Sequence, residues 1–175
     1  KDYDGDGIPP MACFGDGIPF HVTGLIHDES GFPSTSPAVT EKLLSRLMSK
    51  IYNNLDDIVD YEMLYTDDAD TVIVTFGATA RSATRAVKLL RQEGLKVGML
   101  RLKTIWPFAH KAIDKLKQGK AKSLIVAEMN YGQLIETVKA SAEGTLKVYG
   151  LNKYNGELIT PQEIMDKVRE VAANA

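Results

Sequence analysis

The stretch FHVTGLIHDESGFPS, residues 20–34, holds two histidines, an aspartate and a glutamate among glycine, proline and serine residues. His21, His27, Asp28 and Glu29 would offer imidazole and carboxylate groups, which are ligands for divalent metal ions. The two histidines lack the separation of three or four residues that places a pair of ligands on one face of a helix. We therefore favour a hydrogen-bonded loop and predict that none of these side chains is a metal ligand.

Two aspartate-glycine motifs near the N-terminus resemble parts of metal-binding loops. In DYDGDG, residues 2–7, the aspartates stand at the alternating ligand positions of a calcium-binding loop. The twelfth loop position is Cys13, where such a loop has a glutamate, so a solvated turn is favoured. The motif GDG, residues 15–17, with Asn53 and Asn54, is similar to the magnesium and diphosphate motif of thiamine diphosphate enzymes, but its separation from the asparagines is too long. We expect neither motif to bind a metal.

Polar residues also gather where predicted strands end, which is where open α/β sheets place their ligands. In AEMNYGQL, Glu128, Asn130 and Gln133 follow a strand and precede a helix. They are candidates for contact with a ligand or a partner protein, although Asn130 can instead cap the helix and Gly132 can allow close packing. Gly77 also lies between a strand and a helix and could present backbone N–H groups to a phosphate. A simple turn is favoured there, because the chain lacks a dinucleotide-binding or P-loop signature.

The elements that must position these residues begin with an irregular arm. Residues 1–35 are rich in glycine and proline and show no sustained apolar period, which predicts an extended connector. Ser36 and Pro37 then supply an N-cap and a first-turn proline, and apolar residues recur every four positions from Val39. We predict an amphipathic linking helix in residues 36–60. Its wide apolar stripe needs a partner, either the following domain or another subunit.

From residue 61 to residue 175, apolar strand patterns alternate with helical patterns. The strand candidates are residues 61–65, 71–77, 96–102, 123–129 and 146–151. Two of the intervening helices are predicted to end at Gly94 and Gly119, and Thr160, Pro161 and Glu163 form a capping box that opens the last helix. The alternation predicts right-handed crossovers and a three-layer α/β/α domain around a mainly parallel sheet.

Composition narrows the classes of function. The 175 residues carry a formal net charge of −2, which gives no broad attraction to nucleic acid or anionic lipid. Cys13 is the only cysteine, so an intrachain disulfide and a four-cysteine zinc or iron–sulfur site are excluded. The N-terminus has no secretory signal and no apolar run is long enough to cross a bilayer, so we expect a cytoplasmic protein. Because Lys1 is the first residue, we expect the natural polypeptide to begin further upstream.

Several motifs taken together resemble one family. They are, in chain order, TGLIHDESGFPSTSP, RLKTIWPF, AEMNYGQL and GELITPQEI. They resemble the α subunit of 2-oxoacid:ferredoxin oxidoreductases, most closely that of the 2-oxoglutarate enzyme, and the likeness extends over residues 7–171. In that family these segments form a connector followed by a domain like the C-terminal domain of transketolase. The resemblance implies a five-stranded sheet with one antiparallel strand, the first, near residues 61–65.

The resemblance also implies a reaction and partners. Enzymes of the family oxidatively decarboxylate a 2-oxoacid, transfer the acyl group to coenzyme A and pass electrons through iron–sulfur clusters to ferredoxin. Thiamine diphosphate, magnesium and the clusters would be held by other domains or subunits, so we expect no cofactor and no catalytic residue in this chain. The implied partners are the β subunit, further small subunits and ferredoxin, in an oligomer without nucleic acid or membrane. His27, Asp28 and Glu29 would then belong to a strap fixed by hydrogen bonds and ion pairs.

We therefore predict a connector arm in residues 1–35, a linking helix in residues 36–60 and a transketolase-like domain in residues 61–175. The chain would act as a scaffold and subunit interface, with WPF, residues 106–108, among its contacts, and would be inactive alone. One alternative is a free-standing domain that binds a small molecule or nucleotide at the turn after Gly77 or at the Glu128 cluster. A metal-dependent hydrolase built on His21 and His27 is another. Within the family, pyruvate and branched-chain 2-oxoacids remain alternative substrates.

Overall fold

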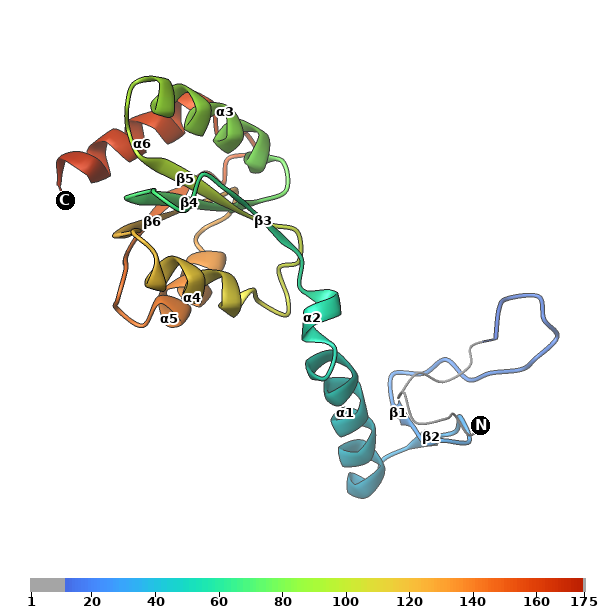
Figure 1. Ribbon diagram of the computed structural model, residues 1–175. Helices are drawn as coiled ribbons and strands as arrows, with labels where there is room; N and C mark the ends of the chain where they lie inside the picture. The colour runs from blue at the N-terminus through green and yellow to red at the C-terminus, as the bar shows by residue number, and fades with distance from the viewer. Residues whose placement is uncertain (1–11, 175) are drawn as a thin grey trace. The chain divides into compact units, whose positions relative to one another are not determined.

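The computed structural model describes residues 12–174 and divides the chain into two units (Figure 1). The N-terminal unit ends at Ile58, and the C-terminal unit begins at Val59. The calcium-loop motif of residues 2–7 lies outside the described residues. No helix in residues 12–174 is both long and apolar enough to span a bilayer.

The regular secondary structure in the described part of the N-terminal unit is a short hairpin followed by two helices. Strands β1 (Ile26–His27) and β2 (Pro33–Ser34) pair antiparallel within the arm that was predicted to be irregular. Helix α1 (Pro37–Tyr52) follows, and a single turn, α2 (Leu55–Ile58), closes the unit. The hairpin escaped prediction because strands of two residues are too short to show an alternating pattern.

The ends of α1 differ in detail from the prediction. Pro37 occupies the first turn as expected, but the side chain of Ser36 makes no capping hydrogen bond. The predicted helix is interrupted after Tyr52, where Asn53 is the C-cap and the Nδ2 atom of Asn54 donates to the Lys50 carbonyl oxygen at 2.8 Å. An asparagine amide that bonds a terminal carbonyl satisfies a group that the helix itself leaves unpaired. This local bond competes with continuation of the helix beyond Tyr52.

The apolar stripe of α1 is only partly covered within its own unit. None of the residues of α1 is buried. Leu44, Met48 and Tyr52 recur every four residues and have exposed fractions of 50%, 39% and 55%. Since side chains at this spacing lie on one side of a helix, they form a continuous exposed apolar strip.

The C-terminal unit is built on a five-stranded sheet with the strand order β3-β5-β4-β6-β7. The strands are β3 (Tyr61–Leu64), β4 (Thr71–Phe76), β5 (Val97–Leu102), β6 (Ser123–Glu128) and β7 (Lys147–Asn152). All neighbouring pairs are parallel except β3 and β5, so the expected antiparallel strand is the first one. The predicted fold class is therefore confirmed.

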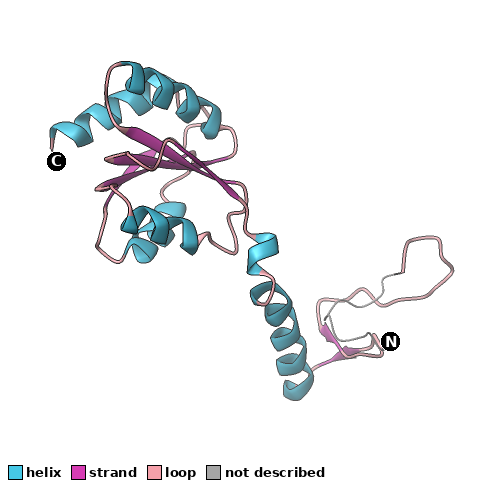
Figure 2. Cartoon of the chain, viewed as in Figure 1, coloured by secondary structure: helices cyan, strands magenta, loops and turns pink. Residues whose placement is uncertain are grey.

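Two helices cover each face of this sheet (Figure 2). Helices α3 (Thr79–Gln92) and α6 (Pro161–Ala173) pack on one face, and α4 (His110–Gln118) and α5 (Leu134–Ala142) pack on the other. The central strand β4 serves both cores, because Val72 and Val74 join the α4–α5 side and Ile73 joins the α3–α6 side. All three side chains are completely buried. This explains why the strand reads as a continuous apolar run.

The two edges of the sheet have distinct chemistry. On β3, Glu62 lies 3.2 Å from an Arg101 nitrogen and 3.0 Å from Lys103 Nζ. The hydrogen bond from Lys103 is the main cause that lowers the pKa of Glu62. On β7, a Cβ atom at Gly150 would lie 2.7 Å from Asn152 Oδ1, so glycine lets that side chain fold back along its strand. The Asn152 Nδ2 atom donates to the Asn130 carbonyl oxygen at 3.2 Å.

Candidate functional site at the carboxyl edge of the sheet

Glu128 is the last residue of β6, and its side chain is 1% exposed. Its two carboxylate oxygens accept hydrogen bonds from the backbone N–H groups of Leu134, at 2.9 Å, and Ile135, at 3.1 Å. These N–H groups open helix α5 and have no partner within the helix. A carboxylate at a helix N-terminus is also favoured by the helix dipole. Glu128 therefore caps α5 from the preceding strand.

Asn130 organises the turn between β6 and α5. Its Oδ1 atom accepts hydrogen bonds from the backbone N–H groups of Gly132, at 2.8 Å, and Gln133, at 3.0 Å. Gly132 has a φ of 99°, a conformation that glycine adopts without strain. Gln133 stands at the N-cap position but is exposed and makes no side-chain cap. The sequence-predicted cluster is thus brought together, with Glu128 and Asn130 bonded to backbone and Gln133 directed to solvent.

An exposed aromatic pair lies at the same edge. Tyr131, after β6, and Tyr154, after β7, have exposed fractions of 81% and 65%, and their ring centroids are 4.7 Å apart. Trp106, after β5, is 59% exposed, whereas Phe108 of the same motif is buried in the core. Sequence reasoning had singled out WPF but missed the tyrosine pair, because its members come from different loops. The edge therefore presents large aromatic side chains beside polar groups that are already bonded.

The turn after β4 is local in its bonding. Gly77 has a φ of 58°, and its carbonyl oxygen accepts a hydrogen bond from the Ala80 N–H group at 3.3 Å. Helix α3 begins at Thr79 without a side-chain cap. The geometry matches the simple strand-to-helix turn that the sequence favoured.

The segment that opened the sequence analysis is held by hydrogen bonds and an ion pair. His27 Nε2 lies 2.8 Å from Thr23 Oγ1, and the His21 ring packs against Phe32 with centroids 4.9 Å apart. Asp28 Oδ1 accepts from the N–H groups of Ser30 and Phe32 at 2.9 and 3.1 Å and from the Ser30 hydroxyl. The Ser30 hydroxyl bond is the main cause that lowers the pKa of Asp28.

Glu29 extends this strap to helix α1, where its Oε1 atom lies 2.7 Å from Lys42 Nζ. Across residues 12–174, histidine, cysteine and acidic side chains nowhere form a group of three able to hold a metal ion. The GDG motif is likewise engaged locally, since Asp16 Oδ2 accepts from the Cys13 N–H group at 2.8 Å.

A lysine-centred network fixes the loop between β7 and α6. Lys153 Nζ lies 3.0 Å from Glu163 Oε1, 3.2 Å from Glu157 Oε2 and 3.2 Å from the Leu158 carbonyl oxygen. Glu163 also forms the predicted capping box with Thr160. The backbone N–H of Thr160, followed by Lys153 and the Thr160 hydroxyl, lowers the pKa of Glu163 to about 2. This loop is therefore tied to the start of α6 by charged groups.

Comparison with known proteins places these features in one family. Residues 69–164 match the family described as pyruvate:ferredoxin oxidoreductase core domain II. The chain is 44% identical over 159 residues to the 2-oxoglutarate synthase subunit KorA of Methanothermobacter marburgensis. This alignment covers 90% of this chain and 42% of that protein. It is 39% identical over 164 residues to KorA of Methanothermobacter thermautotrophicus, with 93% of this chain and 43% of that protein covered.

A solved structure is similar over nearly the whole chain. It is the 2-oxoglutarate:ferredoxin oxidoreductase from Magnetococcus marinus with 2-oxoglutarate, coenzyme A and succinyl-CoA bound, with a TM-score of 0.77 at 32% identity, covering 94% of this chain and 29% of that chain. The chain thus spans less than half the length of the relatives it matches. The motif resemblance is confirmed, and the chain belongs to the pyruvate:ferredoxin oxidoreductase core domain II family.

Proposed function

We propose that this chain is the connector and transketolase-like domain of the α subunit of a 2-oxoacid:ferredoxin oxidoreductase. The enzyme would convert a 2-oxoacid, coenzyme A and oxidised ferredoxin to acyl-CoA, CO2 and reduced ferredoxin in the cytoplasm. The observation that carries the proposal is the 44% identity with a 2-oxoglutarate synthase subunit over 90% of this chain. The same observation favours 2-oxoglutarate over pyruvate and branched-chain 2-oxoacids as the substrate.

Within that enzyme, the chain would act as a scaffold rather than as a catalyst. Four of the polar side chains that the sequence offered for chemistry are bonded to backbone groups or engaged in ion pairs, whereas Gln133 is exposed to solvent. Glu128 and Asn130 hold the start of α5, and Asp28 and Glu29 hold the strap. These bonds support a structural role for the four side chains, because a ligand that binds the same atoms would have to break them.

The exposed apolar side chains support a role in subunit contact, which we assign to the β subunit. One set is the strip on α1 formed by Leu44, Met48 and Tyr52, and another is the tyrosine pair at the carboxyl edge of the sheet. Tyrosine and tryptophan are enriched among the residues that dominate binding energy at protein interfaces. A tyrosine or tryptophan side chain buries a large area at a low cost in side-chain entropy. Contact with another chain would remove these surfaces from water.

The residues that are similar to the magnesium and diphosphate motif of thiamine diphosphate enzymes do not form a shared metal site. The aspartate of the similar motif, Asp16, accepts from its own loop, Asn53 is the C-cap of α1, and Asn54 donates to Lys50. Three residues with these local roles leave no shared ligand set for a magnesium ion, which requires near-octahedral geometry. We propose that the cofactor and the iron–sulfur clusters are bound by other domains or subunits of the enzyme.

The test is an assay of the complete enzyme that contains this chain. We expect coenzyme A-dependent release of CO2 and reduction of ferredoxin, fastest with 2-oxoglutarate when pyruvate and a branched-chain 2-oxoacid are compared. Native mass spectrometry should show this chain bound to the β subunit. Absence of turnover with all three substrates, or a strictly monomeric chain in the presence of the β subunit, would contradict the proposal.

Two further measurements separate the alternatives. Calorimetry of the 175-residue chain with coenzyme A and nucleotides should show no binding, whereas tight binding would favour a free-standing ligand-binding domain. The double variant Tyr131→Ala/Tyr154→Ala should weaken association with the β subunit. Lys147→Ala, at the opposite end of β7, is a matched control that should not.

A further inference from the structure

The loop between β7 and α6 contains the only asparagine of the chain that is followed by glycine, in the dipeptide Asn155–Gly156. Residues 154–158 are all exposed. The ends of the loop are fixed, since Lys153 Nζ lies 3.0 Å from Glu163 Oε1 and Ile159 is 1% exposed. The dipeptide therefore lies at an exposed tip between two anchored ends.

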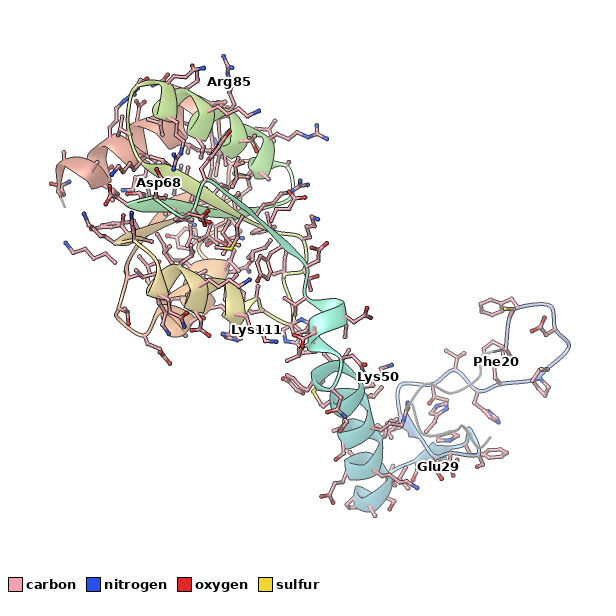
Figure 3. All side chains as sticks on the ribbon, viewed as in Figure 1. Phe20, Glu29, Lys50, Asp68, Arg85 and Lys111 are labelled. Carbon is pink, nitrogen blue, oxygen red and sulfur yellow. The ribbon has the colours of Figure 1, made fainter. Side chains whose placement is uncertain are left out.

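Exposure alone does not distinguish this dipeptide, because many side chains of the domain point outwards, Arg85 among them (Figure 3). The backbone nitrogen of Gly156 is what sets it apart. Among residues 12–174, no group accepts a hydrogen bond from the Gly156 N–H. Gly156 has a φ of 86°, and a Cβ atom built there would meet nothing within 4 Å. Its nitrogen is therefore unbonded and lies in an open part of the loop.

The Asn155 side chain is fixed within the same turn. Its Oδ1 atom accepts a hydrogen bond from the Glu157 N–H at 3.1 Å, and its Nδ2 atom donates to Glu157 Oε2 at 3.2 Å. An asparagine that bonds the backbone two residues further on forms an Asx turn. The N–H group that faces Oδ1 would stabilise negative charge developing on that oxygen, as an oxyanion-hole donor does. The Cγ atom is thereby activated towards a nucleophile.

We propose that Asn155–Gly156 is a site of self-modification, in which the backbone nitrogen of Gly156 attacks the side chain of Asn155 to form a succinimide. Hydroxide takes the proton from the Gly156 nitrogen, whose lone pair forms a bond to Asn155 Cγ. The Cγ–Nδ2 bond breaks, and the amide nitrogen takes up a proton from solvent and leaves as ammonia. Nothing is oxidised or reduced in this step.

Water then opens the succinimide ring in one of two ways. Addition at Cγ breaks its bond to the Gly156 nitrogen and leaves an aspartate at position 155. Addition at the main-chain carbonyl carbon leaves an isoaspartate, in which the chain continues through the side chain. Water and hydroxide are therefore the only co-reactants that the modification needs.

Asn152, three residues earlier, shows why the reaction should be selective. It is also exposed, but the backbone N–H of the next residue, Lys153, donates to the Glu128 carbonyl oxygen at 3.2 Å. That bond would have to break before the nitrogen could attack, which slows attack by up to about tenfold. The Asn152 side chain is itself bonded to the Asn130 carbonyl oxygen. Asn155 should therefore react first.

The modification would alter both the charge and the path of the loop. Either product replaces an amide by a carboxylate near Glu157, whose Oε2 atom already lies 3.2 Å from Lys153 Nζ. Neighbouring carboxylates repel one another. Isoaspartate also lengthens the main chain by a methylene group and removes the Asx turn. The segment between Lys153 and Thr160 should therefore loosen.

Incubation of the 175-residue chain in mildly alkaline buffer made with isotopically labelled water tests the proposal. Digestion at acidic pH, which slows the reaction, followed by tandem mass spectrometry should find an acid in place of the amide at residue 155. The new carboxylate should carry labelled oxygen. We expect conversion at Asn155 to be about tenfold faster than at Asn152. The rate should rise with hydroxide concentration, because the attacking nitrogen must lose its proton.

Two variants isolate the chemistry. Asn155→Gln keeps the amide but requires a larger ring, so it should give no product at this position. Freshly purified Asn155→Asp supplies the charge without the rearranged backbone. An isoaspartate-specific methyltransferase identifies the rearranged fraction of the wild type. Amide hydrogen exchange in residues 153–160 should be faster in that fraction than in Asn155→Asp.

Three results would overturn the proposal. They are an unconverted Asn155, equal conversion at Asn152, and a rate that does not change with pH, since each contradicts attack by the Gly156 nitrogen. Unchanged exchange in the isoaspartate fraction would contradict the loosening of the loop. None of these measurements depends on turnover of a 2-oxoacid, so their outcome leaves the proposed function to be tested separately.

Discussion

Replacement of Glu128 separates a helix-capping role from contact with a ligand. The buried carboxylate accepts the N–H groups of Leu134 and Ile135, one with each oxygen. Glu128→Gln keeps the shape of the side chain but replaces one acceptor with an NH2 group that faces an N–H donor. Glu128→Ala removes both acceptors and leaves a cavity. If the side chain is a cap, both variants lose stability, and alanine loses more.

The expected sizes follow from the cost of a buried donor without a partner, about 1–3 kcal/mol for each N–H group. Glu128→Gln leaves one such donor and should lower the free energy of unfolding by about 2 kcal/mol. For a chain of this length, that lowers the Tm by about 4–8 °C. Glu128→Ala leaves two donors and should cost about 3–5 kcal/mol, after allowance for a charge that no longer has to be buried.

Thermal and urea unfolding of the 175-residue chain measure these losses. Amide hydrogen exchange should accelerate first at Leu134 and Ile135. Glu136→Gln is the matched control, because Glu136 is in the first turn of the same helix but its side chain is 71% exposed and bonds only to Lys139 in the described chain. Wild-type stability and exchange in Glu128→Gln, together with a raised KM for the 2-oxoacid or coenzyme A, would refute the capping role.

Three further outcomes are expected. Glu163→Gln should cost about 1 kcal/mol at neutral pH; because folding lowers the pKa of Glu163 to about 2, this advantage of the wild type is present above pH 4.5 and should vanish in urea titrations as the pH falls towards 2. Gly98→Ala should destabilise the sheet by about 1–3 kcal/mol in thermal unfolding, since a Cβ atom there would lie 2.7 Å from the Tyr65 carbonyl oxygen, whereas Gly24→Ala, which meets open space, should be neutral. Asp28→Asn should speed amide hydrogen exchange in residues 28–32 at neutral pH, because it weakens the hydrogen bonds that the carboxylate accepts. Since the pKa of Asp28 lies below its usual value, exchange in the wild type should approach that of the variant only on acidification. Equal exchange rates at neutral pH would contradict a structural role for Asp28.

The α/β domain could be predicted closely because its strands are short apolar runs bounded by helix stops. The run in residues 71–77 became β4, Thr71–Phe76, and the predicted stop at Gly94 follows α3 with a φ of 87°. The direction of strand β3 could not be predicted from the sequence pattern. A strand as short as β3 has the same alternation whichever way it runs, so its antiparallel pairing came from family resemblance and not from periodicity.

In the candidate site, contacts between residues close in sequence could be predicted, whereas contacts between different loops could not. A capping role for Asn130 was considered because asparagine is a common capping residue, but its Oδ1 atom bonds the backbone N–H groups of the turn residues Gly132 and Gln133, which precede the first residue of α5. Capping of α5 by Glu128 could not be predicted from local sequence, because it depends on the end of strand β6 lying next to the first turn of the helix. Tyr131 and Tyr154 meet only because parallel strands β6 and β7 deliver their following loops to one edge. Pairings of this kind are set by topology.

The unequal borders of the five-stranded sheet bear on how this domain can assemble. Strand β3 is brief and carries an ion-paired carboxylate, and β7 carries a glycine and a folded-back asparagine amide. Charged or interrupted border strands resist the addition of a further strand from a neighbouring chain. Self-association into continuous β-structure is thereby discouraged, and the domain should join its neighbours through helix surfaces and loops.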